Sequence, residues 1–196
     1  MFLEGRVGIR RLYSFALLSA TASSLVMAFG ARAVIWACYC AGWWHNHVLD
    51  REGNKTEQYG KLQRVNAALH RLGAICMQYR HEETYFVGGF TGEELRGCGN
   101  TAAEAVDTRC FKGIHAGGAR LLAGRMSPMD GAAGECVYIA AAEDLQGCEE
   151  TVCRVEFACK GKFRVADLDG EPEIIDLGEG RYAFDMKGCQ GAVLLA

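Results

Sequence analysis

The chain has 196 residues, of which 50% are hydrophobic and 23% are charged, and its formal net charge is -3. This composition excludes an intrinsically disordered chain, whose hydrophobic content would be much lower. The slight negative charge also leaves no basic face to neutralise phosphates, so we expect no nucleic-acid partner. The length predicts one domain, or one domain joined to a fragment of another.

The first predicted element is an apolar run over residues 12–30. Gly30 ends this run, and a second apolar segment over residues 34–39 follows almost at once. We predict a helix and then a short buried strand, because strands of parallel sheets are apolar on both faces. A second interpretation stays open, in which residues 12–30 are a signal peptide or a membrane anchor and the small-residue motif at 31–33 is a cleavage site.

The next predicted element is an amphipathic helix. Residues 50–54 have the composition of a turn, and Thr56 is a suitable N-cap. Apolar residues then recur three or four positions apart, at Tyr59, Leu62, Val65, Leu69, Leu72 and Ile75. The first 82 residues therefore read as helix, strand, helix.

From about Thr84 the apolar residues repeat every second position, which is typical of strands. The alternating segments are residues 84–90, 119–126, 135–142, 151–159, 162–168, 172–177, 181–186 and 191–196. Their short spacing predicts an antiparallel β-sandwich. We place a domain boundary between residues 1–82 and 83–196, and we expect residues 84–196 to fold on their own.

Alternation within two of these segments predicts which side chains enter the core. These are Val152, Val155 and Phe157 in one segment and Tyr182, Phe184 and Met186 in the other.

The chain has ten cysteines, and none of them form a CxxC motif. Several lie in or beside apolar runs, where cysteine behaves as a small core residue: Cys136, Cys153, Cys159 and Cys189. We therefore expect buried, reduced thiols and a cytoplasmic protein. Paired thiols would instead be expected if residues 12–30 direct export.

Several motifs in the N-terminal half resemble one enzyme family. They are AFGARAVIW at 28–36, Tyr39, His45-Asn46, LDREGNKTEQY at 49–59 and VNAALHRLG at 65–73. Together they resemble the end of the catalytic barrel in β-galactosidase-like glycoside hydrolases of the family 42 type. The resemblance continues more weakly through 121–124 and 191–195. It implies an α/β plus β fold, in which the terminal helix-strand-helix of a (β/α)8 barrel is followed by an antiparallel β-sandwich.

The resemblance also implies hydrolysis of O-glycosidic bonds in carbohydrate metabolism. Enzymes of this kind carry the acid/base Glu after the fourth barrel strand and the nucleophile Glu on the seventh, and both would lie upstream of Met1. We therefore expect a C-terminal fragment or subunit with no catalytic residue of its own. The chain also has pairs of adjacent acidic residues, at 82–83, 93–94, 143–144 and 149–150. These pairs cannot replace the two catalytic residues, because adjacent residues of a strand point to opposite faces.

Sugar-contacting residues are expected just past the predicted strand, where barrel enzymes build their sites. Aromatic faces pack on a pyranose, and an imidazole or amide binds hydroxyl groups. The candidates are Tyr39, Trp43, Trp44, His45 and Asn46. An alternative for Trp43 and Trp44 is that they cap the barrel mouth or form a subunit contact.

We expect no cofactor. We also expect no metal, because His45 and His47 have a spacing suited to metal ligands on a strand but the sequence places no third ligand beside them. The expected partners are a galactoside-like carbohydrate once the barrel is completed, and either a chain encoded upstream or a second copy. A membrane is not expected. The alternative function is a β-sandwich binding module without enzymatic activity, exported or membrane-anchored through residues 12–30.

Overall fold

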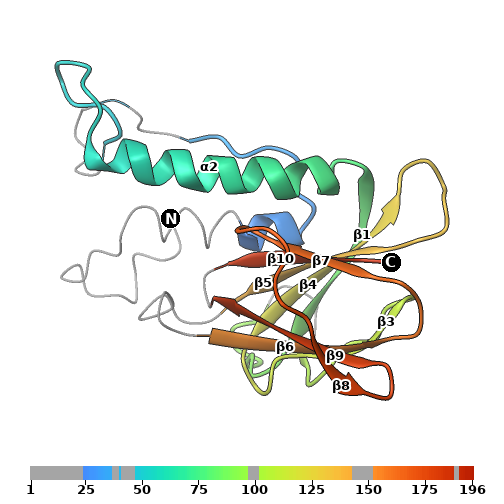
Figure 1. Cartoon of the computed structure of the whole chain (residues 1–196). Helices are drawn as coiled ribbons and strands as arrows, with labels where there is room; N and C mark the ends of the chain where they lie inside the picture. The colour runs from blue at the N-terminus through green and yellow to red at the C-terminus, as the bar shows by residue number, and fades with distance from the viewer. Residues whose placement is uncertain (1–23, 37–39, 41–46, 97–101, 143–151, 188–189) are drawn as a thin grey trace.

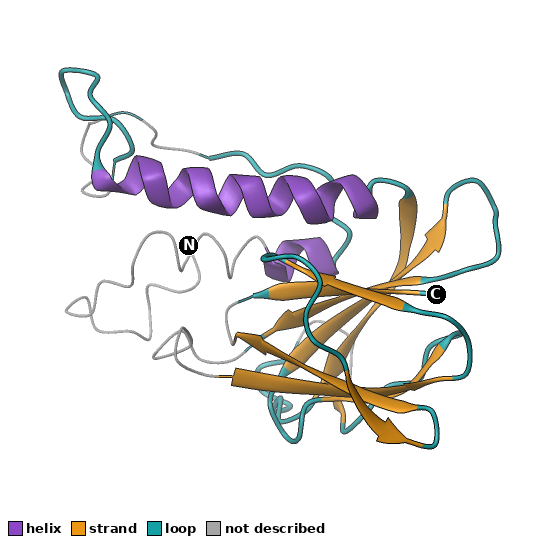
Figure 2. Ribbon diagram, in the orientation of Figure 1, coloured by secondary structure: helices purple, strands orange, loops and turns teal. Residues whose placement is uncertain are grey.

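A computed structural model describes residues 24–36, 40, 47–96, 102–142, 152–187 and 190–196. The protein is mostly β, with two stacked sheets and a helical layer over one of them (Figures 1 and 2). Each of the alternating segments predicted from the sequence contains a strand, so the prediction of a β-rich, mostly antiparallel fold is confirmed.

The larger sheet has six strands in the order β2-β1-β4-β5-β10-β7. Their bounds are Ala102–Ala103 for β2, Tyr79–Val87 for β1, Leu121–Pro128 for β4, Cys136–Ala141 for β5, Gly191–Leu195 for β10 and Arg164–Asp167 for β7. The β1 and β2 strands pair in parallel, and the other pairs of this sheet are antiparallel.

The smaller sheet has four antiparallel strands in the order β3-β6-β9-β8. Their bounds are Phe111–His115 for β3, Val152–Cys159 for β6, Arg181–Lys187 for β9 and Ile175–Gly178 for β8. The sequence pattern did not predict β2 and β3.

The main core lies between the two sheets. Phe111, Phe157 and Phe184 meet there, and the ring of Phe157 lies 5.6 Å from that of Phe111 and 6.4 Å from that of Phe184. Val155 and Met186 are buried in the same core, as predicted, and Tyr182 is partly buried against it. The prediction for Val152 is wrong. Its side chain is 64% exposed, because it is on the same face of β6 as Arg154 and its neighbour Cys153 points inward.

A second core lies on the other face of the six-stranded sheet. There a helix, α2 (Glu57–Cys76), and a helical segment at residues 24–28 pack on the strands (Figure 2). Leu72 of α2 is buried in this core with Tyr138 and Val193 of the sheet. Since both faces of the sheet are covered, every residue of the central strand β5 is buried.

The predicted N-terminal signals of α2 are confirmed. The Thr56 hydroxyl accepts a hydrogen bond from the Gln58 amide at 3.2 Å, which satisfies a donor that the first turn leaves unpaired. The Asp50 carboxylate accepts from the Asn54 amide at 2.7 Å and closes the preceding turn. A second hydrogen bond, from the Asn54 side-chain amide at 3.0 Å, together with the first, holds the pKa of Asp50 below its ordinary value.

The segment after Gly30 differs from the prediction. Gly30 has a φ of 77° and ends the helical segment, as expected. The buried strand predicted over residues 34–39 is not formed in its described part, since residues 34–36 belong to no sheet and Ile35 is 91% exposed. The apolar run fitted a buried strand, but residues 30–36 extend along α2 instead (Figure 1). Residues 37–39 lie outside the described residues.

The described helices and strands do not test whether residues 1–82 correspond to the end of a barrel. They also do not test the predicted domain boundary at residue 82. The boundary falls inside β1, and α2 shares a core with the sheet beyond it. In the part of the chain that the structure describes, no helix is long and apolar enough to cross a membrane.

Candidate functional site

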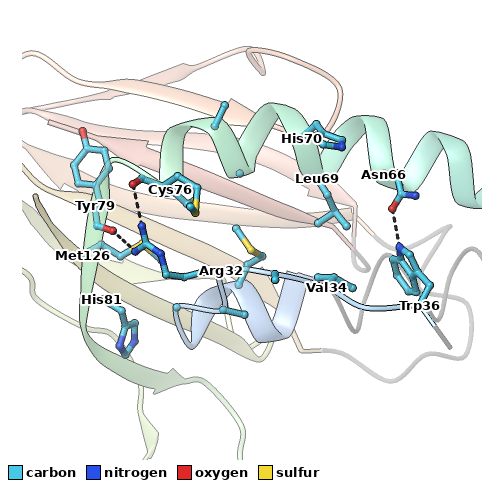
Figure 3. Close-up of a pocket in the computed structure, with 17 residues that line it drawn as sticks. Arg32, Val34, Trp36, Asn66, Leu69, His70, Cys76, Tyr79, His81 and Met126 are labelled. Atoms are coloured by element: carbon cyan, nitrogen blue, oxygen red, sulfur yellow. Dashed lines mark hydrogen bonds between the residues drawn. The ribbon is translucent and has the colours of Figure 1, made fainter.

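A cavity of about 420 Å³ opens between residues 30–36, α2 and the six-stranded sheet (Figure 3). Residues 30–34 and Trp36 form one wall. The face of α2 that carries Asn66, Leu69 and His70 forms the opposite wall. Cys76, Tyr79 and Met126 lie at the end of the cavity nearest the sheet. Its lining is mainly apolar, with a few polar groups, which is the usual character of a small-molecule site.

The outer end of the cavity is fixed by a hydrogen bond between its two walls. The indole Nε1 of Trp36 donates to the Asn66 Oδ1 at 2.8 Å (Figure 3). Trp36 ends one of the motifs that carry the family resemblance, and Asn66 is in another. The fold therefore brings two segments, which are 30 residues apart, into one site.

The inner end of the cavity is organised by Arg32. Its guanidinium donates to the carbonyl oxygens of Met77 at 3.0 Å and Tyr79 at 3.1 Å. These carbonyls follow the last turn of α2, which contains no basic residue of its own. Arg32 thus supplies the positive charge that favours a helix C-terminus, and it anchors the wall of residues 30–36.

The sequence-predicted sugar contacts do not fall on the described part of the chain. Tyr39, Trp43, Trp44, His45 and Asn46 all lie outside the described residues. Along the sequence, the described residues next to them are Trp36, Cys40 and His47. A parallel β-bridge joins Cys40 to Leu49. These predicted contacts therefore stay predictions. The cavity itself was not predicted, because its walls meet only through tertiary packing.

The described acidic doublets are held by polar partners. Glu82 binds the Ser127 hydroxyl and Arg80, and these hydrogen bonds hold the pKa of its carboxyl below the ordinary value. The Glu94 carboxylate accepts from the Thr91 amide at 2.8 Å and from Arg120 at 2.9 Å, and its pKa is lowered mainly by Thr91. Residues 143–144 and 149–150 lie outside the described residues.

A buried carboxylate that the sequence analysis missed is that of Glu135, which is 2% exposed. It accepts hydrogen bonds from the Thr108 hydroxyl at 2.6 Å, the Cys110 amide at 2.9 Å and the Arg109 amide at 3.2 Å. Both of its oxygens are therefore used to hold the turn before β3. We assign Glu135 a structural role, because a carboxylate with this many donors is not available to a substrate.

The described ranges contain no group of three or more His, Cys, Asp or Glu residues that could hold a metal ion. His47 is described, whereas its predicted companion His45 is not.

No protein-family model, curated protein or solved structure matches this chain. The resemblance to β-galactosidase-like enzymes therefore rests on the residues quoted from the sequence, and the activity it implies is a proposal.

Proposed function

We propose that this chain is a C-terminal fragment or subunit of a β-galactosidase-like glycoside hydrolase, in which it helps to bind a galactoside but does not hydrolyse it alone. One observation supports this proposal above the others. Two motifs that carry the resemblance, residues 28–36 and 65–73, lie side by side and are joined by the bond from Trp36 to Asn66. In a barrel enzyme of this kind, the corresponding segments would also be neighbours, so the proposal rests on the adjacency of the two motifs and not on a barrel strand at residues 34–36.

In this proposal the sandwich is the support of the site. Ala68, Leu72 and Cys76 fix the C-terminal half of α2 on the six-stranded sheet. The N-terminal half of α2 extends past the edge of the sheets (Figure 1). The aromatic faces of Trp43 and Trp44 would then pack against a pyranose.

The proposal assigns both catalytic carboxylates to another part of the enzyme or to a partner chain. A retaining glycosidase needs two carboxyl groups about 5–5.5 Å apart across the bond that breaks. Glu82 and Glu94 are bound to polar neighbours, and Glu135 holds a turn. These environments favour surface and structural roles for the three carboxylates.

A β-sandwich binding module without enzymatic activity is the second candidate. The core between the sheets favours this candidate, because none of its buried residues comes from α2 and the sandwich therefore does not need the helix to form its main core. The two candidates differ in what the chain binds and in whether binding depends on the segment after Trp36.

Sugar binding by the full chain tests the proposal. Titration with methyl β-galactoside, followed by tryptophan fluorescence, is expected to show saturable binding in the millimolar range. Trp43→Ala and Trp44→Ala should abolish it. Val152→Ala is the matched control, since Val152 is 64% exposed on the smaller sheet and the variant keeps all three tryptophans, and it should leave binding in place.

Hydrolysis is measured on the same preparation with an aryl β-galactoside. No turnover is expected, because the acid/base and nucleophile carboxyls are not supplied. Turnover that disappears on replacing Glu82, Glu83 or Glu94 would show that the chain is itself the catalyst. The absence of any fluorescence response to the galactoside would instead favour the binding module.

A further inference from the structure

Two buried cysteines meet at the inner end of the cavity. Cys76 is the last residue of α2, and Cys136 is the first residue of β5. Both side chains are buried in the second core, beneath α2, where each thiol is close enough to shift the pKa of the other. The pair therefore joins the helical layer to the central strand of the larger sheet, across the second core.

The two thiols differ in access. Cys76 is 7% exposed and lines the cavity, so a small molecule in the cavity can reach its sulfur (Figure 3). Cys136 is 0% exposed and does not line the cavity. A reagent that enters the cavity will meet Cys76 first and Cys136 only through it.

The two thiols also differ in ionisation. The interaction with Cys136 lowers the pKa of Cys76, and the guanidinium charge of Arg32 acts in the same direction, whereas burial opposes both. The interaction with Cys76, together with burial, raises the pKa of Cys136. The difference in access makes Cys76 the thiol that meets an entering oxidant and Cys136 the thiol that reacts with it afterwards, and the directions of the two pKa shifts agree with this order.

We propose that Cys76 and Cys136 form a reversible disulfide site, which a small hydroperoxide entering the cavity oxidises. The Cys76 thiolate attacks the peroxide, so that an S–O bond forms, the O–O bond breaks, and water or an alcohol leaves. The Cys136 sulfur then attacks Cys76, so that the S–S bond forms and the sulfenic oxygen leaves as water with the Cys136 proton. Two electrons pass from the two thiols to one hydroperoxide, and a small thiol reductant reverses the reaction.

Oxidation has a structural consequence that follows from where the pair lies. The disulfide ties the C-terminal end of α2 to β5, so the helical layer can no longer separate from the sheet. We expect the oxidised chain to melt at a higher temperature than the reduced chain. This site does not depend on the proposed sugar-binding function.

Peptide mapping of the full chain tests the proposal without any variant. The reduced protein is treated with hydrogen peroxide at about one equivalent, its remaining thiols are alkylated, and it is cleaved after Arg and Glu. Cys76 is then carried by LGAICMQYR, residues 72–80, and Cys136 by CVYIAAAE, residues 136–143, each as the single cysteine of its peptide. We expect these two peptides to be linked, and the linkage to disappear with dithiothreitol.

Variants assign the order of the steps. In Cys136→Ala we expect Cys76 to stop at the sulfenic acid, which dimedone will label, whereas Cys76→Ala should leave Cys136 unoxidised. Cys40→Ala is the matched control, because Cys40 is exposed and its removal should not change the linkage. Alkylation of both Cys76 and Cys136 at peroxide doses that oxidise Cys40 would overturn the proposal, as would a different partner for Cys76.

Discussion

Phe184 lies at the centre of the core between the two sheets. Its side chain is 0% exposed, it pairs across strands with Val155, and its ring makes an edge contact with that of Phe157. A side chain in this position contributes both the burial of its own surface and the packing of its neighbours.

We predict that Phe184→Ala lowers the free energy of unfolding by about 3–5 kcal/mol, as is typical for a buried phenylalanine. Val152→Ala is the control, since Val152 is 64% exposed, and it should change stability by no more than about 0.5 kcal/mol. Urea denaturation of the two variants and the parent measures both values. Equal midpoints for Phe184→Ala and the parent would mean that the inward face of β9 is wrongly assigned.

The contrast between Val152 and Cys153 shows what the sequence could predict at this scale. Both residues are apolar, so composition alone did not place the one that points inward. The strand has a period of two, and Val155 and Phe157 are on the face of Cys153, not on that of Val152. Strict counting from Phe157 would have assigned the buried residues of β6 correctly.

At the scale of the elements, close approach of the helical segment 24–28 to β4 depends on Gly124. A Cβ atom at this position would overlap the carbonyl group of Ala28. The same carbonyl oxygen accepts a hydrogen bond from the Thr84 hydroxyl of β1 at 2.9 Å. The segment is thus held by backbone contacts that leave no room for a side chain.

We predict that Gly124→Ala displaces this segment and lowers the free energy of unfolding by about 1–3 kcal/mol, because the overlap is with backbone atoms. Trypsin should then cleave faster after Arg32, whose guanidinium is normally bound at the end of α2. Gly60→Ala is the matched control. Its nearest neighbour would be an Arg64 nitrogen at 3.9 Å, and alanine in the helix should stabilise by about 0.5–1 kcal/mol. Unchanged cleavage after Arg32 in Gly124→Ala would contradict the prediction.

Elements with strong periodicity were predicted well, and short or irregular ones were not. Thr56 and the apolar stripe after it predicted α2, and the alternating segments each gave a strand. The β2 strand has only two residues, and β3 contains Gly113 with a φ of 59° and an interrupted register, so neither has a readable alternation. At residues 34–36 the error is the opposite one, since a strand was predicted where none is formed. The apolar run was interpreted as a buried strand although the sequence did not indicate which strand it would pair with.

The candidate site was less predictable than the fold. The cavity combines residues 30–36 with one face of α2, and no spacing rule relates Arg32 to Met77 or Trp36 to Asn66. The proximity of Cys76 and Cys136 in the second core likewise depends on how α2 packs on the larger sheet. The apolar runs predicted that cysteines such as Cys136 would be buried, but not which cysteines would meet.

On the scale of the whole molecule, the six-stranded sheet belongs to two cores at once. Its inner face packs on the smaller sheet, and its outer face packs on α2 and residues 24–28. The core between the sheets is formed without any residue of the helical layer. The outer core instead depends on residues that precede the predicted boundary at residue 82.

This division predicts how the chain responds to truncation. Residues 78–196 keep all of β1 and the core between the sheets, so they should unfold in one cooperative transition. They should also self-associate, because loss of α2 exposes Leu122, Met126 and Val193 on the outer face of the larger sheet. Residues 84–196 should unfold at a lower urea concentration, since this cut also removes the pairing of Tyr79, Arg80 and His81 with β4.

Urea denaturation and sedimentation of the two truncated chains and the parent measure these differences. A mild detergent should return residues 78–196 to a monomer if the exposed sheet face causes the association. A monomeric 84–196 fragment that is as stable as residues 78–196 would place the boundary where the sequence predicts it. It would also mean that the first half of β1 contributes little to the sandwich. We expect the opposite, because residues 84–196 lack the backbone pairing of Tyr79, Arg80 and His81 with β4, which residues 78–196 retain.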